Sequence, residues 1–317
     1  MKRFLWKACL FIIPFIVIAF VFEYGLSLIP NTYNAKRHNF ESQLDSVEIL
    51  VLGSSQGIFD LNPVYFTHKG FNLSNTSQSL FYDKELLIKY IDRMPKLKCV
   101  VINFSSFSLG AQVGDGIEPW RDFYYYQFWE IKDPKISWFE FKLYSKVFLY
   151  TPKNALLYAS KLFKVDLSTN LTANGFQFRD TANNYKEISD SLGRIRVSLH
   201  NKYFFARNVA ENRANLEQLI VEIKKRGVTP VIVTPPVFKT YSKYADKRRL
   251  KSNVLFIDSL CAQHGCVYYD YFTDKRFDIR DFSDNDHMNF VGAKKFSEIL
   301  NSEVLSKVYC REKVSLH

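Results

Sequence analysis

The chain has 317 residues, of which 47% are hydrophobic and 16% aromatic, so it can bury the core of one large domain without disulfide or metal staples. Its 43 Lys and Arg residues outnumber its 32 Asp and Glu residues, which gives a formal net charge of +11. The basic residues are scattered and no nucleic-acid-binding motif accompanies them, which argues against a nucleic-acid partner and favours a basic surface near anionic lipid or glycan.

The N-terminal segment has the composition of a membrane anchor. Lys7 and Glu23 flank an uncharged run from Ala8 to Phe22. About 20 to 25 residues of this kind cross a bilayer as one tilted helix, and the positive charges before them favour a cytoplasmic N-terminus. A secretory signal peptide is the alternative, but no small-x-small cleavage site follows the run. We expect residues 1–30 to be an uncleaved single-pass anchor in the cell membrane, with the remainder on the periplasmic or extracellular side in a bacterium.

Short apolar runs alternate with helical patterns along the rest of the chain. The apolar runs lack strict alternation of polar and apolar residues, which is typical of parallel strands covered on both faces. The runs are Val47–Leu52, Gly70–Leu73, Lys98–Phe104, Pro230–Val233 and Cys266–Tyr269, and the helical patterns are Tyr82–Met94, Val209–Arg226, Ser252–Gln263 and Val291–Val308. The sequence therefore predicts a three-layer α/β sandwich with a mainly parallel sheet over residues 31–317.

Residues 105 to about 205 interrupt this alternation. Structureless loops of such length are rare, so we expect an insertion or lid subdomain here. Its aromatic residues either pack a small core of the insertion or form a platform for sugar rings or for a membrane surface. The packed core is favoured, because aromatic side chains gain much free energy from burial wherever they lie. These residues are Phe123, Tyr124, Tyr125, Tyr126, Phe128, Trp129, Trp138, Phe139, Phe141, Tyr144, Phe148 and Tyr150.

Five cysteines fit an extracytoplasmic compartment without requiring one. Cys9, Cys99 and Cys310 are isolated, whereas Cys261 and Cys266 flank Ala-Gln-His-Gly. This pair either closes a small disulfide between a helix end and the following strand or remains two thiols beside a turn. The histidine between the two cysteines adds a third metal-ligand type, but no fourth ligand follows at a recognisable spacing, so we expect no metal site.

A serine and a distant histidine supply the residue types of a nucleophile and its base. Ser55 ends the run VLGSS, and Asp284 stands three residues before His287 in DNDHMNF. A serine hydroxyl needs a base to take its proton, and the histidine needs a carboxylate on its other nitrogen. A serine directly after a strand projects from the carboxyl edge of the sheet, where open α/β folds bind their ligands. A spacing of three brings the carboxylate to the imidazole on one helical turn or tight loop.

Other assignments of these residues remain open. Ser54 is the next candidate nucleophile, whereas the other histidines lack a neighbouring acid in such a pattern; they are His38, His68, His200, His264 and His317. Asp284 to Asn289 can also cap the following helix, a role compatible with catalysis. Gly53 and Gly57 would permit a tight turn and the close approach of a substrate.

Gly53-Ser54-Ser55 and the Asp-x-x-His ending at His287 resemble the first and last blocks of the SGNH or GDSL hydrolase family, with Ser in place of Asp in Gly-Asp-Ser. Residues 53–57 also match G-x-S-x-G of α/β-hydrolases, but there several strands precede the serine, and acid and histidine come from separate loops. The SGNH resemblance implies a flavodoxin-like sandwich that hydrolyses or transfers acyl groups through a serine ester.

The middle blocks of that family match less closely. Its Asn-x-Gly-x-Ser-Gly block corresponds to Asn-Leu-Ser-Asn-Thr-Ser-Gln-Ser at residues 72–79, and its Gly-x-Asn-Asp block to Asn-Phe-Ser-Ser at residues 103–106. The family stabilises the oxyanion with backbone N–H groups and an amide side chain. The resemblance therefore implies Ser55, Asn75, Ser77 and Asn103 as candidates for the oxyanion hole.

The weak middle blocks and the single anchor resemble the branch that includes the teichoic-acid D-alanyl transfer and alginate O-acetylation proteins. That branch works beside a multi-pass membrane O-acyltransferase. The resemblance implies an acylated polysaccharide or small ester as substrate, such an acyltransferase as partner, and no cofactor. Hydrolysis and transfer both stay open, because an acyl-serine passes to whichever acceptor the pocket admits.

Two further classes compete with an enzyme of this kind. A catalytically inactive SGNH-like protein would bind glycan or scaffold a membrane O-acyltransferase. A nucleotide-binding flavodoxin-like protein is disfavoured, because no Gly-rich phosphate loop follows any predicted strand.

Overall fold

The computed structural model describes residues 1–29, 31–149, 170–179 and 188–308. The chain divides into two compact units. Residues 1–35 and 120–169 form one, which we call the anchor unit, and residues 36–119 and 170–317 form the other, which we call the α/β unit.

A parallel sheet of five strands lies at the centre of the α/β unit in its described residues. The strand order β2-β1-β3-β4-β5 is that of flavodoxin-like folds. The strands are β1 (Ile49–Leu52), β2 (Gly70–Asn72), β3 (Cys99–Asn103), β4 (Thr229–Thr234) and β5 (Val267–Asp270). The first and last residues of each strand lie within two residues of the predicted bounds. The predicted α/β class and parallel sheet are therefore confirmed.

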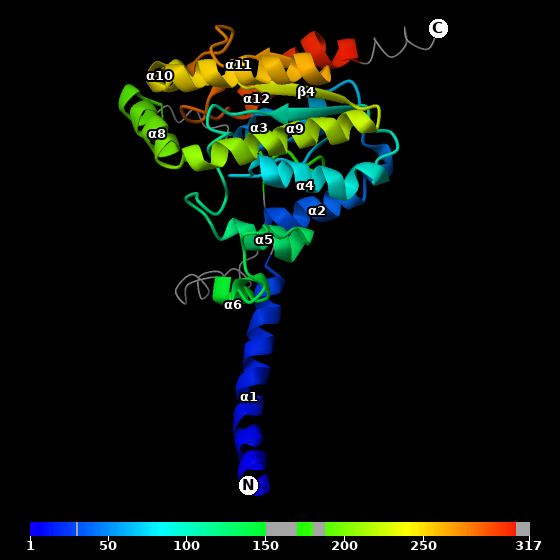
Figure 1. Ribbon diagram of the computed structural model, residues 1–317, viewed down its shortest axis with the longest axis vertical. Coiled ribbons are helices and arrows are strands. Elements are labelled where there is room, and N and C mark those ends of the chain that lie inside the picture. Colours follow the sequence, from blue (N-terminus) through cyan, green and yellow to red (C-terminus); the bar gives the residue numbers. More distant parts are fainter. Residues whose placement is uncertain (30, 150–169, 180–187, 309–317) are drawn as a thin grey trace. The chain divides into compact units, whose positions relative to one another are not determined.

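Helices cover the sheet on both faces because successive side chains of a strand point to opposite sides. Val51, Val101 and Val231 pack with Phe296 and Leu300 in one buried cluster. Helix α12 (Phe290–Leu300) supplies the last two residues and contacts α3 (Ser55–Asp60). On the opposite face, α9 (Val209–Lys225) contacts both α4 (Leu80–Tyr90) and α11 (Lys247–His264). Figure 1 shows α9 running alongside α4.

A polar N-cap explains why one helix starts earlier than predicted. Helix α11 begins five residues before the predicted Ser252, because the Asp246 side chain accepts hydrogen bonds from the backbone N–H groups of Arg248 and Arg249. Several helices were not predicted, since they are short or lack an apolar stripe. In the α/β unit these are α3, α8 (Asp190–Lys202) and α10 (Lys239–Tyr244), and α2 (Thr32–Glu41) spans the boundary of the two units.

The anchor unit contains α1 (Lys2–Ser27), α5 (Arg121–Trp129) and α6 (Lys146–Leu149). Helix α1 is long and apolar enough to cross a membrane, and none of its apolar window is buried by the protein. Tyr124, Tyr125 and Trp129 are buried, and the ring of Tyr33 meets Tyr124 and Tyr125 edge-on at 5.3 and 5.2 Å. The favoured interpretation of a small aromatic core therefore describes this part of the insertion.

The predicted insertion is divided between the two units. Residues 105–119 and 188–205 belong to the α/β unit, whereas residues 120–149 belong to the anchor unit. Much of the remaining segment, including Tyr150, lies outside the described residues, so a single lid subdomain stays a prediction. Cys310 and His317 also lie outside them. Cys261 and Cys266 are unbridged thiols in hydrogen-bond contact.

The central strand provides a test of the packing. Ile102 in β3 is fully buried, so we expect Ile102→Ala to lower the free energy of unfolding by about 2–5 kcal/mol through lost burial and the cavity left behind. Ile88→Ala on α4, where the side chain is 45% exposed, should change it by less than about 0.5 kcal/mol. Chemical denaturation of the solubilised full chain measures both, and equal effects would contradict this packing.

Candidate active site

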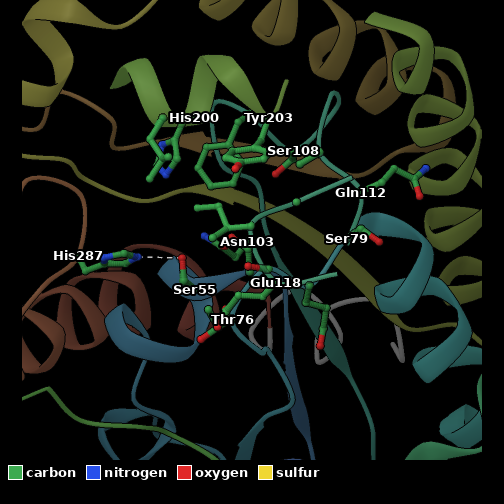
Figure 2. A pocket seen from close by; sticks show the side chains of 18 of the residues that line it. Ser55, Thr76, Ser79, Asn103, Ser108, Gln112, Glu118, His200, Tyr203 and His287 are labelled. Atoms are coloured by element: carbon green, nitrogen blue, oxygen red, sulfur yellow. Dashed lines mark hydrogen bonds between the residues drawn. The ribbon is translucent and has the colours of Figure 1, made fainter. Parts of the chain in front are cut away.

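A chain of hydrogen bonds joins the three residues that the sequence singled out. Nε2 of His287 lies 2.8 Å from Oγ of Ser55, and its Nδ1 lies 2.9 Å from Oδ2 of Asp284. His287 is 2% exposed. Figure 2 shows the imidazole of His287 facing the Ser55 hydroxyl. The hydroxyl of Ser54 instead lies 3.1 Å from Oγ of Ser105, so the structure pairs His287 with Ser55.

A glycine at the end of β1 lets the chain turn toward the serine. Gly53 has φ +136°, and a Cβ there would lie 2.5 Å from Cβ of Asn103. A Cβ on Gly57 would lie 2.4 Å from Oγ of Ser74. Both glycines therefore make room for the ends of neighbouring strands and loops, as the expected tight turn requires. The close approach of a substrate stays a prediction.

Two hydrogen bonds hold the loop of His287 against α3. Nε2 of Gln56 donates to the carbonyl oxygen of Asp286 at 3.1 Å, and the N–H of Met288 donates to Oδ1 of Asp60 at 2.9 Å. Asn289 then caps α12 through a hydrogen bond from the N–H of Gly292. The segment thus both presents the histidine and starts a helix, as the sequence allowed.

Two arginines bind the acid of this group. Arg179 forms an ion pair with Asp284, and its Nη1 lies 3.1 Å from Nδ1 of His287. Nε of Arg196 lies 2.6 Å from Oδ1 of Asp286, and its Nη2 lies 3.8 Å from Asp284. Burial raises the pKa of Asp284, but the charge and hydrogen bond of His287 and the two guanidinium groups outweigh it and hold the pKa well below its usual range.

A second histidine lies behind this cluster. Nδ1 of His200 is 2.7 Å from the Tyr241 hydroxyl, and its Nε2 is 3.7 Å from Asp286. Burial lowers the pKa of His200 to about 4, so its imidazole is neutral at pH 7. The sequence showed no acid beside His200, because the partner stands 86 positions away and only the fold brings it near.

The carboxylates and His287 also have the spacing of metal ligands. Ligand atoms of Asp284, Asp286 and His287 lie within 4.8 Å of one another. Both carboxylates already bind guanidinium groups, which would compete with a cation for the same oxygens. The arrangement therefore fits an ion-pair cluster better than a metal site.

A cavity of about 330 Å³ opens over Ser55 and His287. Its wall includes Ser77 and Asn103, two of the predicted oxyanion residues, whereas Asn75 is not among the described residues that line it. Asn103 is 1% exposed, and its Nδ2 has no hydrogen-bond partner in the described part of the chain. Figure 2 shows this amide beside Ser55. Ser77 has φ +61°, a conformation that favours glycine.

Sequence reasoning missed the groups that position the three residues. Gln56, Asp60, Arg179 and Arg196 all contact the His287 segment, yet none belongs to a motif of fixed spacing. Of these four residues, Gln56 was the most open to prediction from the sequence, because it directly follows Ser55. The two arginines lie in the aromatic insertion, where no periodic pattern points to the site.

No protein-family model matches the sequence, and no curated protein matches it either. Among solved structures, it is similar to a proposed acylhydrolase from Bacteroides fragilis, with a TM-score of 0.43 and 9% identity over 88% of this chain and 99% of the other. A GDSL-like lipase from Bacteroides thetaiotaomicron gives a TM-score of 0.40 and 9% identity over 87% of this chain and 99% of the other.

The neutral His200 predicts how stability changes with pH. Its pKa rises from about 4 in the folded protein to the ordinary 6.5 on unfolding, so the unfolded chain binds more protons between these values. Acidification through this window therefore destabilises the wild type, by at most about 1.4 kcal/mol per pH unit from this one group. We expect His200→Gln to lose less free energy of unfolding than the wild type as the pH falls. Denaturation curves of both proteins at pH 7, 6 and 5 measure this difference. Equal losses in the two proteins would exclude a buried neutral His200.

Proposed function

We propose that the α/β unit is a serine ester hydrolase or O-acyltransferase of the SGNH/GDSL type. The observation that carries the proposal is the continuous hydrogen-bonded chain from Ser55 through His287 to Asp284, which opens on a cavity. A buried imidazole between a hydroxyl and a carboxylate is the arrangement that activates a serine.

In the proposed reaction, Nε2 of His287 takes the hydroxyl proton while Oγ of Ser55 attacks the ester carbonyl carbon. The carbonyl π electrons move to oxygen, and the tetrahedral oxyanion collapses as the alcohol leaves with the proton from His287. Water or a sugar hydroxyl then gives its proton to His287 and attacks the carbonyl carbon of the acyl-serine. The second tetrahedral oxyanion collapses, Oγ of Ser55 leaves and takes the proton back from His287, and the acid or the new ester is released. Asp284 holds the tautomer that accepts at Nε2.

The oxyanion is assigned to donors next to the serine. The N–H of Ser55 and the unpartnered Nδ2 of Asn103 are the best placed, because Asn103 lines the cavity at the end of β3. The backbone N–H of Ser77 is a third candidate from the same wall. Donors fixed in place before the reaction stabilise developing charge without reorganisation.

The cavity and helix α1 support the finer parts of the proposal. Ser79, Ser108, Gln112 and Glu118 line the cavity and can hydrogen-bond hydroxyl groups, which supports an acylated polysaccharide or another polyhydroxyl compound as substrate. With α1 as a single-pass anchor, the reaction would take place outside the cytoplasm, next to a membrane O-acyltransferase that supplies or removes acyl groups.

Covalent labelling tests the nucleophile. We expect a fluorophosphonate to label the full chain, with Ser55→Ala abolishing labelling and Ser54→Ala retaining most of it, since Ser54 bonds to Ser105. Labelled protein on a gel, confirmed by mass spectrometry of the modified peptide, provides the measurement. A folded wild type that takes up no label would instead favour an inactive glycan-binding or scaffolding protein, and labelling lost only with Ser54 would mean the wrong serine.

Two buried asparagines can be compared to find which amide side chain stabilises the oxyanion. Asn75 and Asn103 both have an unpartnered Nδ2 among the described residues, but only Asn103 lines the cavity. We expect Asn103→Ala to lower kcat by about 10²- to 10³-fold with little change in KM, the effect of removing one oxyanion donor. Asn75→Ala should act mainly on stability. Hydrolysis of p-nitrophenyl acetate by both variants decides, and a larger kcat loss in Asn75→Ala would reverse the assignment.

A further inference from the structure

Four aromatic side chains of the anchor unit are exposed together. Trp138, Phe139, Phe141 and Tyr144 are 57–91% exposed, with Phe139 at the upper limit. We call them the aromatic patch. Clustered exposed apolar side chains mark an interaction site more often than a bare surface. The buried Tyr124, Tyr125 and Trp129 form the core of the same unit, so the aromatic patch is not needed to fill it.

The aromatic patch is held in a defined shape. The ring of Tyr126, from α5, meets both Trp138 and Tyr144 edge-on at 5.8 Å, and the Tyr144 hydroxyl donates to the carbonyl oxygen of Trp138 at 3.0 Å. Nζ of Lys132 lies 4.6 Å from the Trp138 ring centroid. These contacts fix the orientation of the Trp138 and Tyr144 rings before any partner binds.

Glu23 ties this segment to the end of α1. Its carboxylate accepts hydrogen bonds from Oγ of Ser145 at 2.7 Å and from the N–H groups of Lys146 and Val147 at 2.6 and 3.2 Å. These bonds cap α6 (Lys146–Leu149), which begins two residues after Tyr144, the last residue of the patch. Figure 1 shows α6 beside the C-terminal end of α1.

The length of α1 places Glu23 at a membrane boundary. About 20 residues precede it in the helix, and at 1.5 Å per residue they span roughly 30 Å, the thickness of the hydrocarbon core. If α1 crosses a bilayer, Glu23 lies where the helix enters the headgroups. The segment that Glu23 caps must then lie at the same depth.

The composition of the segment suits that depth. Tryptophan and tyrosine are enriched at membrane–water interfaces, and lysines beside them attract anionic lipid. Lys142 and Lys146 flank Tyr144 in sequence. Nζ of Lys142 lies 5.6 Å from the ring centroid of Phe123, and Nζ of Lys146 lies 5.6 Å from that of Phe128. A sugar-binding platform would need no such position at the end of an apolar helix.

We propose that the aromatic patch inserts into the headgroup region of the bilayer and forms, with α1, a two-part attachment to the membrane. The lipid surface is the partner because the aromatic patch is continuous, through the Glu23 cap, with the helix that is apolar enough to span the membrane. This attachment is independent of the reaction at Ser55. The anchor unit is thereby fixed at two points and cannot rotate freely about α1.

Tryptophan quenching by lipid tests the proposal. Phe139→Trp and the matched Leu255→Trp each add one tryptophan at an exposed apolar position, Leu255 being 60% exposed on α11 of the α/β unit. The full chain is reconstituted in phosphatidylcholine–phosphatidylglycerol vesicles with and without brominated phosphatidylcholine. We expect the emission added at residue 139 to be blue-shifted and mostly quenched, and the emission added at residue 255 to remain unquenched.

Emission at residue 139 that is no more quenched than at residue 255 would overturn the proposal. If that emission stays unquenched but changes on adding soluble polysaccharide, the aromatic patch is a glycan surface instead. Trp138→Phe gives a second measurement without adding a ring: the difference from wild type should be a quenchable component, and its absence would also count against lipid contact. None of these readouts depends on fluorophosphonate labelling.

Discussion

The hydrogen bonds between α3 and the His287 loop are the constraint on which the candidate site depends. Ser55 and His287 are 232 positions apart, yet Gln56 and Asp60 bond to the residues on either side of the histidine. The distance between nucleophile and base is therefore set by a loop bonded directly to α3. Displacements of about 1 Å can cost 10²-fold in rate, so this link is a condition of the proposed chemistry.

Charge balance is the second condition. Burial raises the pKa of the Asp60 carboxyl, which links α3 to the loop, well above its usual value. Beside His287, the carboxylates of Asp284 and Asp286 form ion pairs with the guanidinium groups of Arg179 and Arg196. In the proposed reaction, His287 takes the serine proton, the arginines oppose the new positive charge, and Asp286 offsets part of that opposition. A single acid beside two arginines would leave the imidazolium less stable.

Local signals predicted the strands and the three central residues. Apolar runs end in Gly-Ser-Ser or in polar residues at the carboxyl edge of the sheet, and Asp284 lies within the same short loop as His287. The arginines and the His200–Asp286 contact arise from tertiary pairing across distant segments, which no spacing reveals. Burial in the insertion was predictable only in part. Trp129 is buried but Phe139 is 91% exposed, although both are large aromatic side chains in the same segment.

Ser77 has a backbone conformation that is normally adopted by glycine. The family resemblance places a glycine there, and the chain adopts the left-handed φ of +61° that glycine suits. A serine in that conformation costs about 1 kcal/mol and is retained only when the surroundings hold it. The hydrogen bond from the N–H of Asn75 to the carbonyl oxygen of Gly53, at 3.2 Å, fixes the loop against the nucleophile turn. Because the N–H of Ser77 exists whatever its side chain, this loop can supply the proposed oxyanion donor without a glycine.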